Sequence, residues 1–322
     1  MQEFRESAPR QHVYILRIWE TRSEQTDAPA TWHCSAQDPQ TGERRGFASL
    51  EGLMDFLAGR TGQTGYRRGR LSPLPLLEVA SAGAGGAGRE AKESGGGPAG
   101  ERGSDRCETP QHEVTVARDY YLGKFEVTQA QWQAVMGSNP ARFFGVGPDY
   151  PVYDVSWLDI AGPNGFLERL NAALGTTSFR LPTEAEWEHA ARAGSTTEFP
   201  FPAPAGWDVG CEDFAAADPH MWWCGNAAYT AHPVGEKLPN PWGLHDMNGN
   251  VWEWVQDYWH DDYTGSPPTD GRAWLVPPSW SRVLRGGSWK GEARSCRSAQ
   301  RYSYYPDTWG HGILGFRIAM TP

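Results

Sequence analysis

Two stretches between residues 126 and 194 predict amphipathic helices with explicit start and stop signals. In "EVTQAQWQAVMG" and "LPTEAEWEHAARAG", Thr128 and Thr183 stand at the N-cap positions, and Gln131 and Glu186 follow three residues later. This spacing is typical of a capping box, and the glycine that ends each pattern favours a C-cap. A tryptophan lies four residues after each cap, and we expect it to anchor its helix in the core.

A third helical pattern is interrupted after one turn. Ser156 and Asp159 form another cap pair, but Gly162 and Pro163 follow directly. Proline lacks a backbone N–H donor and crowds the preceding turn, so the helix is expected to end there.

Beyond residue 195 the pattern predicts short strands joined by long loops. In "GFRIAM" apolar and other residues alternate, so Phe316, Ile318 and Met320 face the same side. The segment shows no strand–helix–strand alternation, which argues against a parallel sheet. We therefore predict an α+β unit with two main helices placed before an irregular antiparallel sheet.

The first third of the chain has a different character. Residues 12–60 predict a small ββα module, with strands in "HVYILRIWE" and "TWHCSAQDP", a turn in "DPQTGERRG" and a helix that starts after Ser49. Residues 81–106 are rich in Gly, Ala, Ser and Glu and too poor in apolar residues to fold. We predict a flexible linker over 61–106 and the α+β unit over 107–322.

Charge and hydropathy narrow the possible partners and the location. The formal net charge of −10 argues against a nucleic-acid partner, because phosphate binding needs a clustered basic face. No stretch approaches the roughly 18 apolar residues of a membrane span. The first residues lack the charged and apolar regions of a secretory signal. A cytoplasmic protein without a membrane span is expected.

The cysteines point to packing rather than to a metal or redox motif. Five cysteines are an odd number, and none form a C-x-x-C pair. Cys211 and Cys224 could meet in space as a disulfide. In a cytoplasmic protein, free thiols are the expectation.

Five motifs together resemble one known family. They are "GKFEVTQAQW", "FRLPTEAEWEHAARAG", "NPWGLHDMNGNVWEW", "RVLRGGSW" and "GFR". In order and spacing they are similar to the formylglycine-generating enzyme (sulfatase-modifying factor) superfamily. The resemblance covers about residues 107–322 and implies a C-type-lectin-like fold. It says nothing about residues 1–106.

The oxidase branch of this superfamily binds copper with a pair of cysteines just after the "GGS-aromatic" motif. Here Lys290 and Gly291 follow Trp289, and no cysteine occurs before Cys296. Because Cu(I) prefers two thiolates, the resemblance implies neither bound copper nor formylglycine-generating activity. An enzyme or enzyme-like member that lacks the copper cysteines stays open as the alternative.

The C-terminal segment resembles a different, non-enzymatic branch more closely. "RVLRGGSW", "AR", "CRSA", "R", "PD" and "GFR" follow the framework of variable proteins of diversity-generating retroelements, whose intervening positions are diversified by mutation at adenines. Asparagine codons mutated in this way reach Tyr, Ser, Thr, Gly and His, whereas Lys290, Glu292, Gln300 and Trp309 are not reached. The resemblance implies a variable recognition surface within residues 290–312. Its expected ligand-binding residues are Gly291, Ser295, Tyr302, Ser303, Tyr304, Tyr305, Thr308, Trp309, Gly310, His311 and Gly312.

The residue types in this segment favour the same function. Tyrosine offers large, stiff, amphipathic contact area, and Ser and Gly add adaptable hydrogen bonding, as in antibody binding loops. The run "YSYY" cannot face one core as a strand, because neighbouring side chains point to opposite faces. We predict a non-catalytic protein that binds a protein or another macromolecule. The alternatives are that these tyrosines line the interior or that the fold is a purely structural scaffold.

"HDMNGNVWEW" is a candidate metal site. Asp246 and Glu253 carry carboxylates on either side of an Asn-Gly turn, and oxygen ligands of this kind suit Ca²⁺. The resemblance implies a structural calcium ion bound by the Asp246 and Glu253 side chains and the Gly249 and Val251 carbonyls. The alternative is an Asx turn in which Glu253 caps backbone amides.

Overall fold

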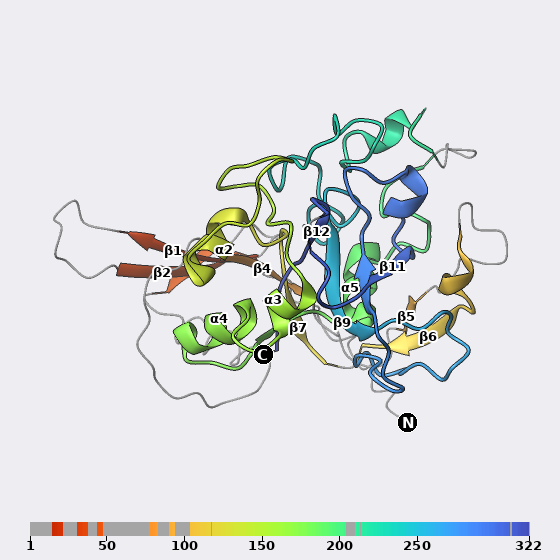
Figure 1. Ribbon diagram of the computed structural model, residues 1–322, viewed down its shortest axis with the longest axis horizontal. Helices are drawn as coiled ribbons and strands as arrows, with labels where there is room; N and C mark the ends of the chain where they lie inside the picture. The colour runs from red at the N-terminus through yellow and green to blue at the C-terminus, as the bar shows by residue number, and fades with distance from the viewer. Residues whose placement is uncertain are drawn as a thin grey trace, which may run out of the picture.

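The computed structural model places a large α+β unit against a set of N-terminal strands (Figure 1). The described residues are 15–21, 31–37, 44–47, 77–82, 90–93, 104–116, 118–203, 210–212, 214–309 and 311–321. The predicted helix after Ser49 lies outside these residues. None of the helices in the described part of the chain has both the length and the apolar character that a membrane crossing needs.

A seven-stranded sheet joins the N-terminal strands to the α+β unit. Its strand order is β3-β2-β1-β4-β7-β13-β8, and all its neighbours are antiparallel. Figure 1 shows β1 and β2 at one end of the molecule, away from the strands coloured blue. The strands are β1 (Ile15–Thr21), β2 (Thr31–Gln37), β3 (Arg44–Phe47), β4 (Leu77–Ala82), β7 (Tyr120–Gly123), β8 (Phe179–Arg180) and β13 (Ala319–Met320).

Two strands lie within the range that the sequence predicts to be a flexible linker. β4 pairs with β7, and β5 (Glu90–Glu93) pairs with β6 (His112–Thr115). The prediction was wrong here because composition measures how much apolar surface a segment can bury. Pairing along an existing strand edge uses backbone groups that every residue except proline carries in full. For the same reason β3 occupies the end of a predicted turn.

A second, four-stranded sheet carries the C-terminal segment. Its order is β11-β10-β9-β12, with β12 parallel to β9 and the other pairs antiparallel. β11 is therefore an edge strand. The members are β9 (Trp252–Tyr258), β10 (Arg282–Arg285), β11 (Arg301–Tyr304) and β12 (Leu314–Gly315). Short strands between long loops confirm the predicted pattern.

Four α-helices complete the unit, and both predicted capping boxes are present. The Thr128 hydroxyl accepts from the Gln131 amide at 3.3 Å and the Thr183 hydroxyl from the Glu186 amide at 3.1 Å. The helices are α2 (Gln129–Met136), α3 (Trp157–Ala161), α4 (Phe166–Leu174) and α5 (Glu184–Arg192). The helix is interrupted between α3 and α4, as Pro163 predicts. α4 itself was not predicted, because its N-cap Gly165 has no side chain to signal a helix start.

Aromatic side chains build much of the core. The Trp132 ring of α2 stacks on Phe166 with centroids 5.3 Å apart and meets Phe316 edge-on at 6.0 Å. Phe316, Ile318 and Met320 share this cluster, which confirms the predicted alternation. Trp187 of α5 is fully buried in a neighbouring cluster. Both tryptophans are the core anchors that their helix positions predict.

Candidate recognition surface

The framework part of the C-terminal segment is held by buried arginines. Four arginines of β10 and the following chain are fully buried, and each pairs with a carboxylate from a distant part of the sequence. An isolated buried charge is costly, so each pair fixes the position of its arginine. The pairs are Arg285 with Glu188, Arg297 with Glu108 (2.9 Å), Arg301 with Glu184 (2.7 Å) and Arg317 with Glu253 (2.6 Å).

Arg301, the first residue of β11, is held by several hydrogen bonds of its guanidinium. Its guanidinium donates to both oxygens of Glu184 and to the carbonyls of Cys107 and His260. Burial alone would lower the pKa of Arg301, but the nearby Glu184 carboxylate raises it above its usual value. The pair is therefore charged. Gln300 is also buried and bonds to Arg297 and to the Arg301 carbonyl, which makes it framework.

The residues that follow Arg301 turn outward. Tyr302 is 47% exposed, Tyr305 is 62% exposed and Trp309 is 72% exposed. Ser303, Tyr304 and Thr308 are partly exposed, and His311 is exposed. Gly310 lies outside the described residues. Two of the rings stack on other rings. The centroids of Tyr302 and Trp252 are 5.5 Å apart, and those of Tyr304 and His311 are 4.9 Å apart. Stacked rings offer contact area in a fixed orientation.

Gly291 and Ser295 belong to a separate stretch of the segment. A Cβ on Gly291 would lie 3.3 Å from that of Ser295, and both residues are partly exposed. Ser295 belongs to η3 (Ala293–Cys296), a 3₁₀ helix that buries Ala293 and Cys296. Burial raises the pKa of the Cys296 thiol to about 12. Cys296 is a packing residue, as the resemblance implies.

Gly312 was predicted to bind ligand, and the structure places it in the framework instead. Its φ of 61° lies in the left-handed region, and a Cβ there would overlap the Phe144 ring. Its amide donates to Asp154 Oδ1 at 2.7 Å, and its carbonyl accepts from Trp289 Nε1 at 2.9 Å. Only glycine fits this buried turn, so position 312 anchors the exposed loop rather than presenting a side chain.

A loop at Phe143 and the start of α3 also contact the C-terminal segment, and neither contact was predicted from the sequence. Phe143 is 80% exposed and precedes Phe144, whose ring lies 5.2 Å from Trp289. Leu158 is exposed as well, and its amide donates to the Pro306 carbonyl at 3.0 Å. The signal for the Phe143 loop was "RFFG", two adjacent aromatics without helical or strand period. It is the same signal that singled out "YSYY".

Of the two carboxylates predicted to bind calcium, Glu253 is paired with an arginine. Glu253 accepts from Arg317 Nε and Nη2, both at 2.6 Å, and from Trp187 Nε1 at 2.7 Å. The guanidinium thus supplies the positive charge next to this carboxylate. Burial raises the pKa of Asp246 to about 6, and its Oδ2 accepts from the Gly235 amide. In the described ranges no group of three or more His, Cys, Asp or Glu side chains is arranged for a metal.

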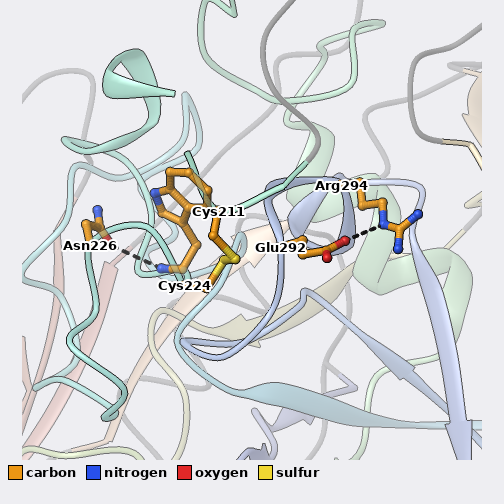
Figure 2. The surroundings of a disulfide bond; sticks show 6 residues. Cys211, Cys224, Asn226, Glu292 and Arg294 are labelled. Carbon is orange, nitrogen blue, oxygen red and sulfur yellow. Dashed lines mark hydrogen bonds and ion pairs between the residues drawn. A yellow bond between two sulfur atoms is a disulfide. The ribbon is translucent and has the colours of Figure 1, made fainter. Parts of the chain in front are cut away.

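Cys211 and Cys224 form a disulfide, and Cys107 and Cys296 are free. This bridge is the pairing that the sequence left open, and it stands in place of the free thiols expected of a cytoplasmic protein at these two positions, which lie 13 residues apart. Figure 2 shows the bridge next to the chain that carries Glu292 and Arg294. Disulfides are typical of oxidising compartments and rare in the cytosol, where they are mostly redox-active.

Comparison with known families identifies the chain. The model of the sulfatase-modifying factor enzyme 1-like domain matches residues 90–322. The chain belongs to this family. The family match begins at β5, upstream of the boundary predicted at residue 107.

Two similar proteins each align with about half of the chain. A formylglycine-generating enzyme of Streptomyces coelicolor is 35% identical over 183 residues, which cover 53% of each protein. The chaperone protein LppX of Paenibacillus barcinonensis is 31% identical over 208 residues, covering 53% of this chain and 69% of LppX. The chain thus spans about half the length of the Streptomyces enzyme.

Two solved structures share the fold of this sulfatase-modifying factor-like domain. PvdO of Pseudomonas aeruginosa superimposes with a TM-score of 0.64 and 29% identity, over 76% of this chain and 94% of PvdO. Variable protein 1 of Treponema denticola gives a TM-score of 0.61 and 28% identity, over 80% of this chain and 99% of that protein. The fold is C-type-lectin-like, and the predicted similarity to variable proteins is confirmed.

Proposed function

We propose that this sulfatase-modifying factor-like domain is a non-catalytic ligand-binding protein that displays a diversifiable recognition surface. The surface consists of the outward side chains of residues 290–311, with a protein or another macromolecule as its partner. One observation carries the proposal: framework positions of the segment are buried and paired, whereas Tyr302, Tyr305 and Trp309 project into solvent. Tyrosine and tryptophan combine a large apolar ring with a polar group, and for this reason they are enriched at interfaces.

The chemistry of the site also favours binding over oxidation. Lys290 and Gly291 stand where the oxidase branch is expected to carry a copper cysteine. The remaining thiol of the segment, Cys296, is fully buried, and its raised pKa keeps it protonated at neutral pH. A thiolate is the form that binds a metal or attacks a substrate. The residues that the segment exposes are suited to contact rather than to catalysis.

The proposal is tested most simply in the DNA around the gene. We expect an imperfect copy of the codons for residues 290–312 near the gene, differing mainly at adenines, together with a reverse transcriptase gene. Differences should fall at outward positions such as Tyr302, Tyr305 and His311 and spare Arg301 and Gly312. Absence of a copy, or differences concentrated at the buried positions, would refute diversification.

The family's enzymatic members define the alternative, and an assay separates the two. The purified chain, incubated with Cu(I) and a cysteine-containing peptide, is expected to consume no oxygen and to form no aldehyde. A Gly291→Cys variant, which places a thiol where the oxidase branch is expected to carry a copper cysteine, is assayed beside it as the matched control. Turnover by the unmodified chain would favour the enzymatic alternative.

A further inference from the structure

The disulfide lies next to residues 291–294, the first part of the proposed recognition surface (Figure 2). Cys211 is exposed and Cys224 is partly buried, so one of the two bridged residues lies at the surface. Figure 2 shows the bridge beside the segment of Glu292 and Arg294, which pair with each other at 2.7 Å. The bridge is therefore both reachable for a solution thiol and adjacent to a segment of the proposed surface.

Each arm of the bridge holds one backbone group of that segment. The Gly210 carbonyl, next to Cys211, accepts from the Ala293 amide at 3.0 Å. The Cys224 amide donates to the Gly291 carbonyl, also at 3.0 Å. The covalent link keeps the two arms together, so both hydrogen bonds can form at once. Residues 291–293 are thus clamped from two sides.

The second part of the segment is anchored elsewhere. The turn at Gly312 is held by Asp154 and Trp289, and β11 is held through Arg301 by Glu184. These anchors come from parts of the chain outside both arms of the bridge. Loss of the bridge should therefore loosen residues 291–295 and leave residues 301–312 in place.

We propose that the Cys211–Cys224 bridge is a thiol–disulfide exchange site that controls the order of residues 291–295. The inference rests on the proposed function only in assigning those residues to the recognition surface. The reactant is a dithiol. Its thiolate attacks Sγ of Cys211, the surface residue of the bridge, and Cys224 leaves as a thiolate and takes up a proton. The second thiol of the reductant then attacks the mixed disulfide and releases Cys211 as a thiol. The dithiol becomes a disulfide, so two electrons and two protons pass to the protein.

Amide hydrogen exchange on the full chain tests this proposal without any ligand. We compare the oxidised protein, the protein reduced with dithiothreitol and a Cys211→Ser/Cys224→Ser variant. On reduction the Ala293 amide should exchange roughly tenfold faster, the effect of losing one hydrogen bond, and the Gly312 amide should be unchanged. A Cys107→Ser variant, which keeps the bridge, should respond to dithiothreitol like the unmodified chain.

Two results would overturn the proposal. One is equal exchange of the Ala293 amide before and after reduction. The other is faster exchange throughout the chain, Gly312 included, which would make the bridge a general stabilising link. If the double serine variant does not fold, the dithiothreitol arm still decides between these results. Failure of the proposed function would appear instead in the DNA comparison, which is independent of the bridge.

Discussion

Arg301 and Tyr302 are neighbours in β11 and have opposite roles. Arg301 is fully buried and paired with Glu184, and Tyr302 is half exposed on the other face of the strand. Successive side chains of a strand point to opposite faces, so one short edge strand carries both a buried ion pair and an exposed ring. In the C-terminal segment, residues that stabilise the fold therefore lie directly beside residues that we propose to bind a ligand.

The largest expected effect on stability comes from breaking the buried ion pair between Arg301 and Glu184. Arg301→Met should lower the free energy of unfolding by about 3–5 kcal/mol, because the buried Glu184 carboxylate loses the guanidinium that donates to both its oxygens and keeps only the more distant Arg285, whose Nε lies 3.8 Å from Oε1. Denaturant unfolding measures the loss. Tyr302→Ala is the matched variant on the exposed face and should cost less than half as much. Adding Glu184→Gln to Arg301→Met should restore part of the stability, and equal losses from Arg301→Met and Tyr302→Ala would abolish the distinction.

His189 of α5, a buried residue, should contribute to the pH dependence of stability. Burial lowers the pKa of His189 from 6.5 to about 4 in the folded protein. The folded state therefore favours the neutral ring, and the stabilisation is complete above pH 6.5 and lost as the pH falls towards 4. This group should account for about 2–3 kcal/mol of that loss. Urea unfolding between pH 4 and 7 should show a flatter profile for His189→Gln, and an unchanged slope would reject this origin.

Gly312 marks the point where the framework meets the exposed loop. Gly312→Ala should cost about 1–3 kcal/mol, because alanine is strained at positive φ and its Cβ overlaps the Phe144 ring. Thermal unfolding measures the cost. Adding Phe144→Ala removes the overlap and not the backbone strain, so it should recover only part of the loss from Gly312→Ala. A neutral Gly312→Ala variant would return position 312 to the set of candidate contact residues.

The smallest effects are expected on the exposed face. Tyr305→Ser and Trp309→Ala should each change the free energy of unfolding by less than about 0.5 kcal/mol, because exposed side chains contribute little to stability. Chemical unfolding of both variants beside the unmodified chain measures this. A loss above about 2 kcal/mol from either variant would show that these rings support the fold.

The sequence predicted features that depend on neighbours along the chain. The capping boxes at Thr128 and Thr183, the break at Pro163 and the alternation from Phe316 to Met320 are local patterns, and all of them are confirmed. The resemblance supplied the division of residues 296–317 into framework and exposed positions. Among the described positions, Gly312 is buried although it was predicted to bind ligand, since only the three-dimensional turn reveals its left-handed backbone.

Features that depend on distant partners could not be predicted. The pairing of Arg297 with Glu108 joins residues 189 positions apart, and no local pattern connects them. β5 forms within a stretch of low apolar content because its backbone pairs with β6. The contact of the Phe143 loop with the recognition segment likewise follows from the fold.

Saturation mutagenesis of residues 282–321, with sorting for folded protein, tests the separation of framework and exposed positions most directly. We expect Arg297, Arg301, Gly312 and Arg317 to tolerate almost no substitution. Tyr302, Tyr305, Trp309 and His311 should tolerate nearly all residue types at full yield of folded protein. Equal intolerance in the two sets would mean that the exposed residues are part of the structural framework, and the proposed recognition surface would have to be abandoned.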